Sequence, residues 1–135
     1  MTGGLESALG EASSPSWIRR ARAGRDLAAF ADVPEAAGAL VGLLLDAQDI
    51  AVTRQTAEAL ARTGTAAAVR LIALAVVEAD GDQADWLQTG VHDACEGPDG
   101  LPDVAAACGK LARDQEGAVR RGAAEISAWT AGTVR

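Results

Sequence analysis

The chain has 135 residues, of which 49% are hydrophobic but only 3% aromatic, and its formal net charge at pH 7 is -7. This length suits a single domain that buries a core without disulfides or a structural metal. The excess of acids argues against a nucleic-acid-binding protein, which needs a positive surface to displace counterions, and it favours a basic partner.

Helices are the regular elements that the composition favours, because Ala, Leu and Val dominate and strand-favouring aromatic residues are scarce. Residues 1–14, rich in Gly, Ser and Glu, are expected to be a flexible lead-in with at most one turn. Residues 15–135 are expected to form one domain of about seven helices. Breaks at Pro, Gly, Ser and Asp predict helices over 16–31, 34–45, 50–63, 66–79, 84–96, 102–113 and 117–131.

The turns between these helices carry recognisable signals. Gly64 is expected to end the helix over 50–63, and the stretch 97–100, Gly-Pro-Asp-Gly, predicts a loop. The acids in 80–85 superficially resemble a calcium loop. An EF-hand loop starting at Asp80 would need Gly and Glu where Asp85 and Val91 stand. We therefore interpret these acids as helix caps and expect no metal.

A repeat of about 34 residues is the most specific feature of the sequence. Residues of one kind recur in the same register in several columns: Ile18, Val52, Trp86 and Val119; Leu40, Leu74 and Cys108; Leu43, Val77 and Leu111; Asp46, Asp80 and Asp114. Each repeat would be a helix pair that buries its apolar side only by stacking on its neighbours. Trp86 is accordingly expected in the core, in the column of Val52.

The stretch Asp114–Glu125 resembles the second-helix signature of bacterial HEAT-like (armadillo-type) repeats, in which a turn Asp precedes Val-Arg and small residues. Asp114 and Arg120 match the turn acid and the helix base. The stretch Val52–Gly64 is similar, with Thr53 where the Arg is expected. The resemblance covers about residues 17–131. It implies an all-α, short right-handed α-solenoid of about four helix pairs, with the second helices lining a concave groove.

Helical spacing divides the segment 50–63 into two faces. One face is expected to be buried and holds Val52, Thr56, Ala59, Leu60 and Thr63. The opposite face, projected onto the other second helices at the repeat spacing, gives a strip in which Gly122 is equivalent to the first member. We predict partner binding at this strip, whose candidate members are Gln55, Glu58, Arg62, Thr89, His92, Glu96, Glu125 and Trp129.

Two features, Trp129 of the strip and the acidic segment between Arg70 and Lys110, each allow two interpretations. Trp129 either anchors a partner or closes the end of the stack over the core. Acids without any cation between Arg70 and Lys110 form either a solvated face or an acidic site for a basic partner. Arginines crowd the first predicted helix instead: Arg19, Arg20, Arg22 and Arg25.

The cysteines and the histidine fit no metal or cofactor site. Cys95 and Cys108 lack metal-ligand spacing, and His92 is the single histidine, so we expect reduced thiols and no cofactor. The first 14 residues lack the basic and apolar regions of a signal peptide, and the longest apolar stretch is too short to span a bilayer. A cytoplasmic location is therefore expected.

Function is predicted from the repeat and from the lack of a catalytic motif. The leading hypothesis is a non-catalytic protein–protein interaction module or scaffold that binds a basic partner; one version is an immunity- or antitoxin-like inhibitor of a toxin. The alternative is an enzyme, since some HEAT-like proteins are alkylpurine DNA glycosylases or phycobilin lyases. DNA binding would need a basic groove, which a strip with Glu58, Glu96 and Glu125 does not supply. The chain is expected to be a monomer, to self-associate weakly through its ends, or to belong to a longer solenoid.

Overall fold

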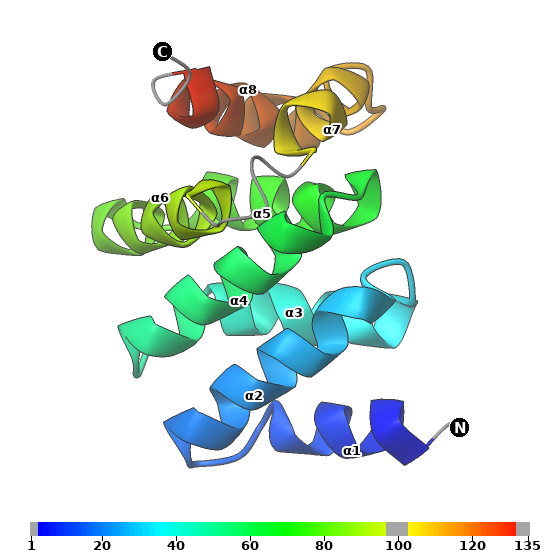
Figure 1. Ribbon diagram of the computed structural model, residues 1–135, viewed down its shortest axis with the longest axis vertical. Helices are drawn as coiled ribbons and strands as arrows, with labels where there is room; N and C mark the ends of the chain where they lie inside the picture. Colours follow the sequence, from blue (N-terminus) through cyan, green and yellow to red (C-terminus); the bar gives the residue numbers. More distant parts are fainter. Residues whose placement is uncertain (1–2, 97–102, 132–135) are drawn as a thin grey trace.

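The computed structural model describes residues 3–96 and 103–131, and every regular element in this part of the chain is a helix (Figure 1). The all-α prediction is confirmed. None of the described helices is both long and apolar enough to cross a membrane. The elements are α1 (Gly3–Glu11), α2 (Trp17–Leu27), the 3-10 turn η1 (Ala28–Phe30), α3 (Pro34–Leu44), α4 (Ile50–Thr63), α5 (Ala66–Glu78), α6 (Gly81–Cys95), α7 (Val104–Leu111) and α8 (Gly117–Ala131).

Helix ends follow the predicted capping chemistry. Helices α4 and α8 have the predicted bounds, and Gly64 ends α4 with a φ of 65°, the left-handed conformation that glycine adopts without strain. Helix α6 begins three residues before its predicted start, because Asp80 and Gln83 form a capping box. The Asp80 carboxylate accepts from the Gln83 N–H at 2.8 Å. The loop predicted at 97–100 and the helix start predicted at 102 lie outside the described residues.

The predicted lead-in differs most from the structure. Where at most one turn was expected, α1 is a nine-residue helix that packs on α2 and also contacts α3. Ala8 is buried, and Leu5 and Leu9 pack against the core. Leu5 and Leu9 are four residues apart and therefore lie on one face of the helix. The apolar contacts of this face stabilise a helix that the Gly-rich composition did not predict.

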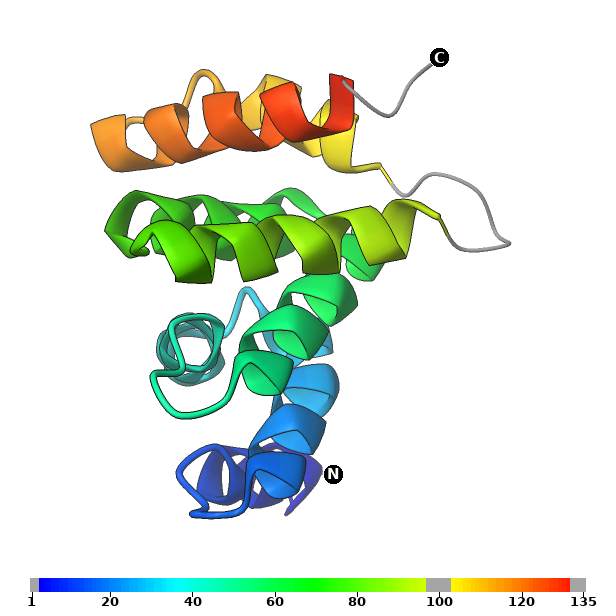
Figure 2. The same cartoon turned by 90° about the vertical axis from the view of Figure 1, so that its left-hand side faces the viewer.

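Helices α2, α4 and α6 follow one another along the long axis of the molecule (Figure 1). Helix α4 packs on α2 and, most extensively, on α6. In Figure 2, α3 is seen end-on and lies to one side of α2 and α4. Helix α3 in turn packs on α5. In this part of the chain α4 thus contacts both α2 and α6, and α3 contacts α5.

The last pair departs from this order. Helix α8 packs chiefly on α5 and only lightly on α6, and Figure 2 shows α7 and α8 as a layer above α5 and α6. The contact is close: a Cβ added to Gly122 would lie 2.1 Å from the carbonyl oxygen of Ala73. Glycine at this position lets the α8 backbone approach α5, which no larger residue would allow without movement.

Two other crossings also depend on small residues. A Cβ on Gly24 of α2 would lie 2.2 Å from Thr56 Oγ1 of α4, and one on Gly90 of α6 would lie 2.4 Å from the carbonyl oxygen of Arg54. The abundance of Ala and Gly is therefore used for close helix packing.

The repeat columns are buried unevenly. Val52 and Val119 are fully buried, but Ile18 is 53% exposed and Trp86 only half-buried. The prediction that Trp86 lies in the core is wrong, because α6 is turned so that Leu87 takes the buried position. A one-residue offset of this kind rotates a helix by about 100°.

The predicted buried face of α4 is confirmed at Val52, Thr56 and Leu60 and is wrong at its edge, where Ala59 is only half-buried. On α4, Thr53 and Ala57 are buried while Thr63 is exposed, because α2 and α6 flank this helix on two sides. On α5, Leu74 is half-buried and Val77 is 38% exposed. The close contact of α5 with α8 runs through Ala73 instead. A periodic apolar pattern locates a helix, but the neighbours decide which residues of it are covered.

Candidate binding site

Three of the eight predicted binding residues, Gln55, Glu58 and Arg62, share one hollow between α2, η1 and α4. We call this the α2–α4 hollow. It has a volume of about 560 Å³ and is lined by Arg25, Ala28, Ala29, Arg54, Gln55, Glu58, Ala59, Arg62 and Thr63. This volume is in the range of pockets that hold small ligands or side chains of a partner.

Helical spacing and small residues create the hollow. Arg54, Glu58 and Arg62 stand four residues apart on α4, so they follow one side of the helix. Opposite them, α2 and η1 contribute Arg25 and two alanines, Ala28 and Ala29. Because alanine side chains are short, they do not fill the space between the helices, and the longer polar side chains border an open hollow.

Weak pairs hold the polar side chains of the hollow. Arg25 Nη1 donates to Gln55 Oε1. Arg62 donates twice to Glu58 Oε2, at 3.1 and 2.8 Å, and Arg54 Nη1 donates to Asp93 Oδ2 of α6 at 3.1 Å. The side chains of Arg62 and Arg54 are 43% and 36% exposed. Exposed ion pairs of this kind contribute about 0–1 kcal/mol each.

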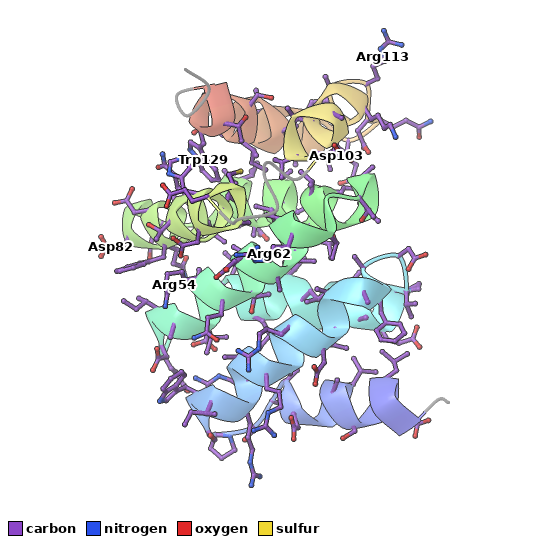
Figure 3. All side chains as sticks on the ribbon, viewed as in Figure 1. Arg54, Arg62, Asp82, Asp103, Arg113 and Trp129 are labelled. Carbon is purple, nitrogen blue, oxygen red and sulfur yellow. The ribbon has the colours of Figure 1, made fainter. Side chains whose placement is uncertain are left out.

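The charge of the hollow is opposite to that of the chain. Three arginines and one glutamate are the charged residues among those that line it, although the chain as a whole carries -7. Figure 3 labels Arg54 and Arg62 along α4. The predicted strip includes Arg62 but lacks Arg25 and Arg54. The spacing of Arg54 from Glu58 and Arg62 was the signal that could have found it.

The other five predicted residues lie away from the hollow. Thr89 is half-buried, and its hydroxyl donates to the Asp85 carbonyl of the same helix at 2.9 Å. Glu96 and Glu125 are exposed. His92 Nε2 lies 3.3 Å from the carbonyl oxygen of Trp129, the residue labelled on α8 in Figure 3.

The predicted strip is therefore divided between two places. Gln55, Glu58 and Arg62 lie in the α2–α4 hollow, while His92 and Trp129 meet between α6 and α8. Gly122, predicted to be on the strip, is buried against Ala73 of α5. The physical reason is the position of α8, which packs on α5 and so no longer extends the face of α2, α4 and α6. Trp129 is half-buried against the edge of the core.

A second hollow, of about 270 Å³, lies at the N-terminal ends of α4 and α6. Its lining includes Trp86 and the acids Asp46, Asp49, Asp80 and Asp82. Three of these acids cap helices or turns: Asp46 accepts from the Asp49 N–H at 2.8 Å, Asp49 from Ala51, and Asp80 from Gln83. The interpretation of Asp80 as a cap is confirmed. Among the described residues, no group of His, Cys, Asp or Glu is arranged to hold a metal ion.

The two cysteines are free thiols. Cys108 is buried and Cys95 half-buried. Burial raises the pKa of both thiols, and a hydrogen bond with Ser127 partly offsets this at Cys108, while the charge of Glu96 adds to it at Cys95. A thiol with a raised pKa is a poor nucleophile at neutral pH, so these residues suit packing better than chemistry.

No protein-family model matches this chain, and no curated protein or solved structure matches it either. The geometry of the described residues is thus the basis for the proposals below.

Proposed function

We propose that the chain is a non-catalytic protein-interaction module whose partner binds the face formed by α2, α4 and α6. The α2–α4 hollow is the observation that carries this proposal. It brings together Gln55, Glu58 and Arg62 with two further arginines, and their intramolecular pairs are exposed and weak. Such side chains can exchange their present partners for those of another protein at little cost.

The proposed architecture is a short right-handed HEAT-like α-solenoid of about four helix pairs. The succession of α2, α4 and α6 supports it, with α3 and α5 as the first helices of their pairs. In this proposal the pair α7–α8 is a terminal unit that turns onto α5 and covers it. End units of repeat proteins commonly depart from the pattern because they close the core.

A basic partner is part of the proposal, with the chain acting as a cytoplasmic monomer. The net charge of -7 gives a long-range field that attracts positive proteins. At the N-terminal ends of α4 and α6, Asp49, Asp80 and Asp82 beside Trp86 add negative charge for such a partner. An immunity- or antitoxin-like inhibitor of a toxin is one form that such a module would take.

Affinity capture tests the proposal. Three immobilised chains would be exposed to the same extract of the host cell: the wild type, a double variant with Gln55→Ala and Arg62→Gln, and a control variant. The control is Arg113→Gln, at the turn after α7 (Figure 3). We expect a partner that the wild-type and control chains retain and that the hollow variant loses. Equal retention by all three chains would place binding elsewhere, and retention of nothing by the wild type would contradict the proposal.

The alternative, a HEAT-like enzyme acting on DNA, gains one favourable observation from the three arginines of the hollow. Against it, no aromatic side chain occurs among the described residues that line the hollow, so it offers no ring to stack on a flipped base. Duplex DNA titrated at two salt concentrations distinguishes the cases. Affinity that falls steeply with salt would favour the enzyme.

A further inference from the structure

The α2–α4 hollow is positive in a negative protein, and this contrast narrows what it can bind. We infer that the hollow receives an acidic segment of the partner, whose side-chain carboxylate sits among Arg25, Arg54 and Arg62. The inference rests on the proposed function, because it names the part of the partner that enters the site. The partner as a whole is steered by the overall charge, whereas the hollow selects the group that docks in it.

The arginines of the hollow have hydrogen-bonding capacity to offer. A guanidinium carries five N–H donors in a planar fork that matches a carboxylate. Toward the described residues, Arg25 and Arg54 each make one side-chain hydrogen bond, and both bonds from Arg62 go to the same oxygen of Glu58. The partner of Arg25 is the neutral amide of Gln55, so the charge of Arg25 is not neutralised within this pair.

Two other arginines of the chain, Arg20 and Arg70, have their guanidinium groups bound by carboxylates of the fold. The Arg20 side chain is 7% exposed and binds both carboxylate oxygens of Asp46, at 2.9 and 3.4 Å, as well as the Ser14 carbonyl oxygen. Arg70 donates to two acids, Asp114 and Glu116. Both arginines are bound by carboxylates of another segment. Arg25 of the hollow differs from them, because it is exposed and bonds a neutral amide, which leaves its charge for an incoming carboxylate. Arg62 is exposed as well, while Arg54 also links α4 to α6 through Asp93.

The floor of the hollow favours a short peptide segment over a polyanion. Ala28, Ala29 and Ala59 give an apolar surface beside the arginines, which suits an Asp or Glu next to a small apolar residue. A nucleic acid brings many phosphates that the remaining surface, with its net negative charge, would repel. A few carboxylates meet much less of that repulsion.

Nuclear magnetic resonance of the full chain, labelled with ¹⁵N, tests the inference. The probes are N-acetylated tetraglutamate and tetraglutamine, each titrated at constant ionic strength, with a DNA oligonucleotide as a third arm. We expect tetraglutamate alone to shift the Nε–Hε signals of Arg25, Arg54 and Arg62 and the amide signals of α2 and α4 in a saturable way.

Two variants with the same change of charge complete the test. Arg25→Gln leaves only the neutral Gln55 without its partner, and we expect about a tenfold loss of tetraglutamate affinity. Arg113→Gln, at the other end of the molecule, should leave that affinity within about twofold. Equal losses in both variants, no shift in the hollow, or tighter binding of the oligonucleotide there at equal salt would each overturn the inference.

The inference and the proposed function can fail separately. A captured partner that binds Arg25→Gln as well as the wild-type chain would overturn the inference and leave the proposed function intact. Tetraglutamate binding in the hollow, with no partner retained by the wild-type chain, would instead remove the proposed function and leave a carboxylate site without a protein ligand.

Discussion

The run α2–α4–α6 and the last pair α7–α8 share the same sequence columns but pack differently. In the run, Asp46 before α4 is bound by Arg20 of the preceding second helix, α2. Before α8, the equivalent acid Asp114 is bound by Arg70 of α5, and the position equivalent to Arg20 is Gln88. Asp46 and Asp114 thus have the same place before their helices, but the arginine that binds each comes from a different element, α2 in one case and α5 in the other.

The largest expected effect separates these two acids. Asp46→Asn removes one partner of a pair whose side chains are only 7% and 10% exposed, which leaves Arg20 buried without its counter-charge. We expect a loss of about 3 kcal/mol in the free energy of unfolding, measured by urea denaturation. Asp114→Asn serves as the matched substitution, because the side chain of Arg70 is 34% exposed and can turn to solvent. Equal losses would mean that the two turns are energetically equivalent.

The position of α8 on α5 is tested by Gly122→Ala. A Cβ there would meet the Ala73 carbonyl oxygen, so we expect a loss of about 2 kcal/mol in the free energy of unfolding. Gly109→Ala on α7 is the control, since nothing lies within 4 Å of its added Cβ. That change should stabilise the chain by up to about 1 kcal/mol through helix propensity. Stabilisation by both substitutions would show that α8 does not approach α5 closely.

Acid should remove the stability that the pair between Arg70 and Asp114 gives to the fold. The hydrogen bond from Arg70 holds the pKa of Asp114 below its usual range, aided by the Glu116 N–H. A lowered folded-state pKa gives a contribution that is complete above the ordinary aspartate pKa of about 4 and is lost as pH falls through the lowered value. Unfolding free energies measured from pH 5 downward should fall less steeply in Asp114→Asn. An identical slope would contradict this role.

The smallest expected effect lies at the crossing of α2 and α4. Thr56 is fully buried, and its hydroxyl has no hydrogen-bond partner among the described residues while it faces Gly24. Thr56→Val keeps the shape and removes the polar atom, so we expect stabilisation of up to about 1 kcal/mol by thermal or urea unfolding. Thr56→Ser, which keeps the hydroxyl and loses a methyl group, should destabilise. Destabilisation by Val would indicate that the hydroxyl has a partner in solution.

Local chemistry made much of the fold predictable. The breaks that bound Ile50–Thr63 and Gly117–Ala131, and the cap at Asp80, act within a few residues of the chain, so the sequence contains their full cause. The placement of α8 on α5 depends on whether Gly122 meets Ala73, which are far apart in the sequence. The spacing of apolar residues along the sequence does not predict a contact between two such distant positions.

The part of the candidate site that lies on a single helix could also be predicted from the sequence. Gln55, Glu58 and Arg62 were found because they share a face of one helix. Arg25 comes from another helix and reaches the hollow only through the packing of α2 on α4. The members projected onto α8 did not reach the hollow, because the projection assumed that every pair stacks alike.

Hydrogen exchange of the captured complex tests the central claim most directly. If the partner binds the face of α2, α4 and α6, the backbone amides of α2, η1 and α4 around the α2–α4 hollow should gain protection on binding, while those of α7 and α8 exchange as in the free chain. Protection confined to α7 and α8, with the amides around the hollow unchanged, would contradict the account.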